Sequence, residues 1–74
     1  MANRLKDIRD SLGISQEGVA RRTRSITTRT VRNAEEGKRV TYDTATQILE
    51  VINSLLLEAG KPTITQEELG LTLY

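Results

Sequence analysis

One short segment of the chain is rich in side chains suited to specific hydrogen bonding: Thr28, Arg29, Arg32 and Asn33. The spacing of Val31 and Ala34 predicts a helix over residues 28–36 in which these two residues face inward and the polar set faces outward. Arginine presents a two-pronged donor that matches guanine, asparagine can pair with adenine, and threonine can bond to several partners. The polar set could therefore recognise base edges, or it could be an ordinary solvated helix face.

The residue types that most often carry catalysis or bind metals are missing. The sequence has no His to act as a base and no Cys to act as a nucleophile, and it shows no glycine-rich phosphate-binding loop. The adjacent acids of Glu35–Glu36 and of Glu67–Glu68 cannot face one substrate, since neighbouring helical residues point about 100° apart. We expect no enzymatic activity, no metal site and no cofactor.

The length of the chain limits it to one domain, residues 1–74, because so short a chain buries only about 60% of its unfolded surface. No stretch approaches the roughly 20 apolar residues of a membrane span, and residues 1–4 lack the apolar run of a signal peptide. The absence of Cys gives no reason to expect an oxidising compartment. We expect a cytoplasmic protein that does not bind membranes.

Charge is distributed unevenly along the chain although the formal net charge is only +1. Residues 1–39 carry ten Lys or Arg and five acids, a net charge of +5, whereas residues 40–74 carry one Lys and five acids, a net charge of −4. One half could face a polyanion while the other half avoids it. A solvated surface of mixed sign is the alternative interpretation.

Hydrophobic periodicity, helix caps and glycines predict an all-α fold. The expected helices cover about residues 2–12, 16–23, 28–36 and 42–59, with one further turn over 66–69. Their predicted N-caps are Ser15, Thr27, Thr41 and Thr65, the last in a capping box with Glu68. Residues 71–74 alternate as a short strand would.

The chain resembles the Cro/repressor-type (XRE-like) helix-turn-helix family over roughly residues 3–57. The resemblance rests on Arg4-Leu5, Ile8-Arg9, Gly13-Ile14-Ser15-Gln16, Val19-Ala20, Ile26-Thr27, Val31 and Glu35-Glu36-Gly37-Lys38. It implies a lambda-repressor-like domain of four to five short helices with a short C-terminal tail and a helix-turn-helix at about 15–36. It also implies a sequence-specific, nucleoid-associated transcriptional regulator, a repressor that binds a palindromic operator in double-stranded DNA as a homodimer.

The resemblance assigns roles to individual residues. Thr28, Arg29 and Asn33 match base-reading positions, and Arg32 lies between them within reach of a base or a phosphate. The expected phosphate contacts are Gln16, Lys38, Arg39 and Thr41, and Gln16 could instead brace a base-reading side chain. Arg21, Arg22 and Arg24 could add phosphate attraction, with at least one of them pointing to solvent. For Lys38 and Arg39 a solvated turn is the alternative. Arg9 and Glu35 match a partly buried ion pair, which makes them structural residues.

The turn between the two central helices departs from the family pattern. Members usually have a glycine four residues after the alanine that Ala20 matches, but Arg24 stands there and the turn is one residue longer. We therefore expect Ser25 to adopt the strained backbone conformation that the glycine would otherwise take.

The C-terminal part, residues 60–74, is expected to form a dimerisation or partner-binding tail. The expected dimerisation residues are Leu55, Leu57, Leu71, Leu73 and Tyr74. One alternative is that the tail folds back over residues 55–57 within a monomer. Another is an antitoxin-like or mobile-element accessory protein whose C-terminal half binds a second protein.

Overall fold

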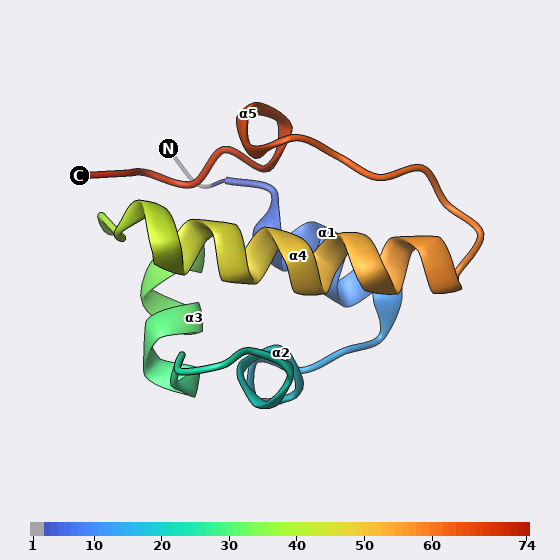
Figure 1. The fold of residues 1–74 in the computed structure, drawn as a ribbon, viewed down its shortest axis with the longest axis horizontal. Coiled ribbons are helices and arrows are strands. Elements are labelled where there is room, and N and C mark those ends of the chain that lie inside the picture. The colour runs from blue at the N-terminus through green and yellow to red at the C-terminus, as the bar shows by residue number, and fades with distance from the viewer. Residues whose placement is uncertain (1–2) are drawn as a thin grey trace.

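The computed structural model describes residues 3–74, which fold into five helices (Figure 1). These are α1 (Leu5–Leu12), α2 (Gln16–Arg22), α3 (Thr28–Glu35), α4 (Tyr42–Glu58) and α5 (Gln66–Leu69). The long α4 crosses the other helices, with α2 and α3 on one side of it and the C-terminal segment on the other. The all-α prediction is confirmed, since the only β-type pairing within residues 3–74 is one isolated bridge between Val40 and Leu73.

Side-chain caps fix where most of the helices begin. Four helices start directly after a predicted cap whose hydroxyl oxygen accepts a hydrogen bond from the N–H three residues on: Ser15, Thr27, Thr41 and Thr65. The capping box of Thr65 and Glu68 is also present. The helices α2, α3 and α4 each end one residue earlier than the sequence predicts.

The first helix begins later than expected, at Leu5. Asn3 lies outside the helix, and its carboxamide makes hydrogen bonds to two backbone groups. Its Oδ1 accepts the Leu5 N–H at 3.0 Å, and its Nδ2 donates to the Ala34 carbonyl at 2.6 Å. The predicted start at Ala2 lies outside the described residues.

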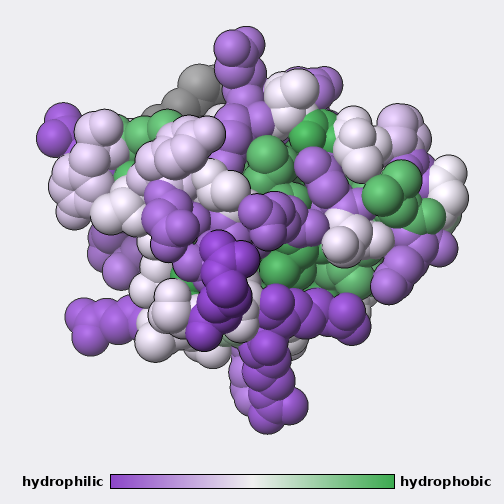
Figure 2. Space-filling model, in the orientation of Figure 1, coloured by the Kyte–Doolittle hydropathy of each residue, from purple (hydrophilic) through white to green (hydrophobic). Residues whose placement is uncertain are grey.

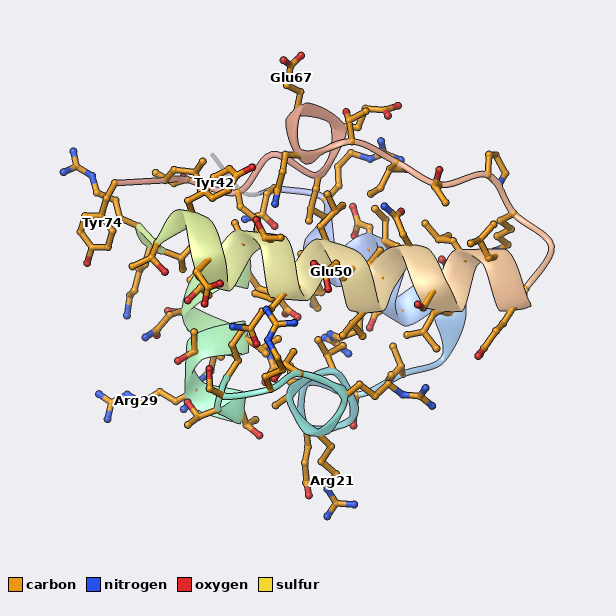
Figure 3. All side chains as sticks on the ribbon, viewed as in Figure 1. Arg21, Arg29, Tyr42, Glu50, Glu67 and Tyr74 are labelled. Atoms are coloured by element: carbon orange, nitrogen blue, oxygen red, sulfur yellow. The ribbon has the colours of Figure 1, made fainter. Side chains whose placement is uncertain are left out.

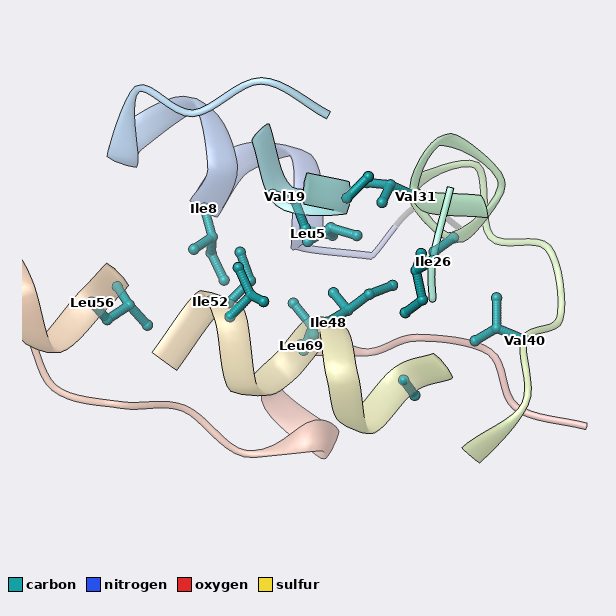
Figure 4. Close-up of a cluster of buried hydrophobic side chains, with 14 residues drawn as sticks. Leu5, Ile8, Val19, Ile26, Val31, Val40, Ile48, Ile52, Leu56 and Leu69 are labelled. Carbon is teal, nitrogen blue, oxygen red and sulfur yellow. The ribbon is translucent and has the colours of Figure 1, made fainter. Parts of the chain in front are cut away.

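All five helices contribute to the core (Figure 4). The largest fully buried side chains are Leu5, Val19, Val31, Ile48, Ile52 and Leu69. Burying one such side chain contributes about 1.5–3 kcal/mol relative to leaving it exposed. Because Leu69 belongs to α5, the C-terminal segment is part of the core and not an appendage to it.

The segment after α4 folds back along that helix, as one of the sequence-based alternatives proposed. The side chain of Asn53 in α4 holds both backbone groups of Ile64, at 3.0 and 2.9 Å. Further along, the Arg4 N–H donates to the Leu69 carbonyl at 3.1 Å. The Val40 N–H then donates to the Thr72 carbonyl at 2.9 Å. Within the described residues, no helix combines the length and the hydropathy that a bilayer crossing requires.

Candidate nucleic-acid interface

The two sides of α3 differ sharply in burial. Val31 and Ala34 are fully buried, and they anchor the helix to the core. On the opposite side Thr28, Arg29 and Arg32 are exposed, and the neighbouring Asn33 is half-buried. Figure 3 shows Arg29 extending away from the body of the protein.

The four predicted base-reading side chains make no hydrogen bond or ion pair with any residue in the range 3–74. Their donors and acceptors are therefore left without a partner among these residues. A short helix with a buried side and an unsatisfied polar side can present these groups to an external partner at no cost in internal hydrogen bonds.

A polar network ties α3 to the two helices before it. Arg9 Nε donates to Glu35 Oε2 at 2.7 Å, and only 12% and 6% of the two side chains are exposed. The Gln16 amide donates to Glu35 Oε1 at 3.0 Å, so the start of α2 joins the same carboxylate. The hydrogen bond to Glu35 raises the pKa of Arg9, which opposes the lowering effect of burial. The bonds of Arg9 and Gln16 to one carboxylate of α3 hold the three helices together.

The turn between α2 and α3 differs from the sequence-based expectation. Ser25 does not adopt a left-handed conformation, because the positive φ angles within residues 3–74 all occur at glycines. Thr23 instead ends α2 in an extended conformation, and its hydroxyl donates to the Ala20 carbonyl at 2.7 Å. The same oxygen accepts the Ile26 N–H at 3.2 Å, so a threonine side chain shapes the turn.

Gln47 of α4 also holds this turn, and sequence reasoning missed it. Its side chain is buried, with 4% of the residue exposed, and its Oε1 accepts the Arg24 N–H at 3.0 Å. A signal was available in the sequence: a turn without glycine must find partners for its backbone N–H groups, and a glutamine within an apolar helix is a candidate.

The arginines of α2 and the turn point in different directions. Arg21 projects from α2 into solvent, where Glu17 Oε1 lies 2.6 Å from its Nη2 (Figure 3). Arg22 and Arg24 instead line a hollow of about 420 Å³ that also includes Glu50 and Glu58 of α4. Arg24 lies 3.7 Å from Glu50 and 3.9 Å from Asp43. The structure thus places Arg22 and Arg24 beside acids of α4.

The segment between α3 and α4 carries the other predicted phosphate contacts. Lys38 and Arg39 are exposed, and Lys38 Nζ lies 3.3 Å from Glu36. Thr41 caps α4 by accepting the Thr44 N–H at 3.1 Å. Between them, Val40 is buried and pairs with Leu73 of the C-terminal segment. This segment therefore supports the basic turn on its inner side.

The structure does not bring the predicted dimerisation residues together. Leu55 and Leu71 are partly buried against the chain's own core. Leu57 is 65% exposed near the C-terminal end of α4. Tyr74 is 83% exposed at the other end of α4, where its N–H donates to the Val40 carbonyl at 3.2 Å. The exposed Tyr42 lies at this same end (Figure 3).

Figure 2 shows how hydrophilic and hydrophobic side chains are distributed over one face of the molecule. Hydrophilic side chains project from the edge that α2 and α3 form, whereas hydrophobic residues show along the middle of the molecule, over α4. Hydrophilic side chains also project from the opposite edge, so the polar surface of this face is not confined to α2 and α3.

These features define a helix-turn-helix unit on a lambda-repressor-like fold. A model of the family described as Helix-turn-helix matches residues 5–58, which is most of the chain. The chain therefore belongs to the Cro/C1-type (XRE-like) helix-turn-helix family, a family of DNA-binding regulators. Comparison with curated proteins and with solved structures found no match.

Proposed function

We propose that this protein binds double-stranded DNA at specific sequences and represses transcription there. The observation that carries the proposal is the exposed side of α3, where Thr28, Arg29 and Arg32 have no side-chain partner among residues 3–74. A major groove about 12 Å wide admits one α-helix, and these side-chain types match base edges. Asn33, half-buried beside them, adds an amide that suits adenine.

Phosphate contacts would flank α3 on both sides and set its register on the duplex. We assign them to Gln16 at the start of α2, to Lys38 and Arg39, and to the N-terminus of α4 at Thr41. Arg21 adds positive charge at the solvent-exposed edge of α2. Arg22 and Arg24 have a lesser role in the proposal because Glu50 and Glu58 lie beside them.

We further propose that two copies bind one operator across a two-fold axis. The large exposed apolar residues Tyr42, Leu73 and Tyr74 lie at the α4 N-terminal end, next to the basic turn. Burying them against the same residues of a second copy would form a self-complementary interface. The two α3 helices would then enter major grooves about 34 Å apart and read a palindrome. Repression follows if the bound dimer excludes other proteins from the promoter.

Selection of duplexes from a random library by the purified protein tests the proposal. We expect enrichment of one motif with two inverted half-sites whose centres are about one helical turn apart. Sedimentation should show a concentration-dependent dimer that Tyr74→Ala weakens. If no motif is enriched, sequence-specific binding is wrong. A motif without symmetry and a protein that stays monomeric would contradict the homodimer.

A further inference from the structure

The inference concerns the carboxamide of Gln47, which lies between the turn and α4. Its Oε1 accepts the Arg24 N–H at 3.0 Å, and its Nε2 donates to Asp43 Oδ2 at 2.8 Å. The same nitrogen lies 3.5 Å from Ser25 Oγ. Within residues 3–74, Gln47 is the one polar residue that is buried, with 4% of it exposed. Its two short hydrogen bonds therefore go to the turn and to its own helix.

The turn depends on this contact because no left-handed residue shapes it. Thr23 fixes one side of the turn through the Ile26 N–H, and Gln47 fixes the other through the Arg24 N–H. Ile26 is buried, and the next residue, Thr27, is the N-cap of α3. A change in the path of residues 23–26 therefore moves the start of α3.

We propose that Gln47 is a positioning residue for base recognition: it sets the pose of α3 by holding the turn against α4. The inference rests on the proposed function. Base contacts require placement to within about 0.5 Å, whereas attraction between charges and phosphates tolerates larger shifts. Loss of the Gln47 carboxamide should therefore reduce specific binding much more than non-specific binding. A residue that only stabilised the fold would not change this ratio in the folded protein.

Three variants separate positioning from folding. Gln47→Leu removes the carboxamide and keeps most of the volume. Gln47→Glu places a carboxylate oxygen where Nε2 lies 2.8 Å from Asp43 Oδ2, so two negative charges meet. Adding Asp43→Asn to Gln47→Glu reverses the donor and the acceptor and restores this hydrogen bond, while the carboxylate keeps an acceptor for the Arg24 N–H. The matched control is Asp43→Asn alone, since its amide oxygen can still accept from Gln47.

The measurement is the ratio of affinities for the selected motif and for a random duplex, at one salt concentration. We expect Gln47→Leu and Gln47→Glu to lower this ratio about tenfold, the discrimination that one base contact supplies. The double variant and the control should keep the wild-type ratio. The inference is overturned if all the variants keep the wild-type ratio, or if the double variant stays as impaired as Gln47→Glu.

Hydrogen exchange of the Arg24 amide tests the contact without DNA. We expect protection in the wild type and its loss in Gln47→Leu under conditions where the α3 amides remain protected. Free exchange of this amide in the wild type would overturn the inference. If the wild type enriches a motif while the affinity ratios of all variants match it, only the inference is wrong. If the wild type prefers no duplex, the proposed function is wrong and the inference falls with it.

Discussion

The guanidinium of Arg9 and the carboxylate of Glu35 lie 2.7 Å apart, and both side chains are nearly removed from solvent. Arg9 also donates to the Ile14 carbonyl at 2.9 Å, just before α2 begins. With Gln16 on the same carboxylate, α1, α2 and α3 share one polar junction. This junction at the C-terminal end of α3 therefore fixes the orientation of the helix and of its exposed side.

Removing the carboxylate should therefore destabilise the whole domain. Glu35→Ala removes the main partner of Arg9, which keeps Asp10 at 3.3 Å and the Ile14 carbonyl, and we expect a loss of about 1.5–3 kcal/mol in unfolding free energy. The neighbouring Glu36→Ala, at an exposed position, should change it by no more than about 0.5 kcal/mol. Urea denaturation measures both. Equal effects of the two substitutions would show that the buried pair has no special role.

The pKa of Arg9 shows how little this residue makes the stability depend on pH. Its pKa is raised on folding, so its contribution is complete below the ordinary titration range of arginine and is lost only as the pH rises through the raised value. Arg9 itself therefore introduces no loss of stability between mildly acidic and mildly alkaline pH.

Gly18 should not tolerate alanine as an ordinary helix position would. Alanine normally stabilises a helix by about 1 kcal/mol relative to glycine. Here a Cβ would lie 2.8 Å from Ile14 Cγ1, and Ile14 packs against the core. We expect Gly18→Ala to lower the thermal midpoint, and the same change in an Ile14→Ala background to raise it. A rise in both backgrounds would mean that Ile14 moves away freely.

The predictable part of the fold comes from local chemistry. Ser15, Thr27 and Thr41 could be recognised as caps because a hydroxyl before an apolar periodicity satisfies the first free N–H groups. The inward Val31 and Ala34 also followed from helical spacing, which separates them from the polar side of α3. Local pattern was therefore sufficient for the helix order and for the exposed residues of α3.

Contacts between distant segments explain what could not be predicted. Local sequence suggested that the turn required a strained Ser25. Gln47, whose side chain holds the turn in the structure, lies more than 20 residues away, and no local pattern pairs it with the turn. The predicted dimerisation residues looked like one apolar surface in the sequence. The fold instead separates Leu57 from Tyr74 by almost the length of α4, because the tail runs back along that helix.

The returning tail gives a stability prediction. Leu69 is fully buried under α4, so Leu69→Ala should cost about 2–5 kcal/mol of unfolding free energy. Leu57→Ala, which truncates a leucine that is 65% exposed, should change stability by no more than about 0.5 kcal/mol. Chemical denaturation of both variants is the measurement. A small effect of Leu69→Ala would mean that the tail does not dock in solution.

The basic turn gives a prediction about salt. Arg39→Ala removes one proposed phosphate contact, so the slope of log affinity against log salt should become shallower by about 0.9. The preferred motif should stay the same, since phosphates carry no base identity. Lys61→Ala removes one positive charge from the loop that follows α4 and serves as the control, with an unchanged slope. Identical slopes for Arg39→Ala and wild type would remove Arg39 from the interface.

The central claim is that the exposed side of α3 reads bases, and Arg29→Ala tests it most directly. Duplex selection with this variant should lose the preference at one base pair of each half-site. Affinity for the wild-type motif should fall by about 1–3 kcal/mol. Asn33→Ala should do the same at a different base pair. If both variants select the wild-type motif with wild-type affinity, α3 does not read the DNA and the account is wrong.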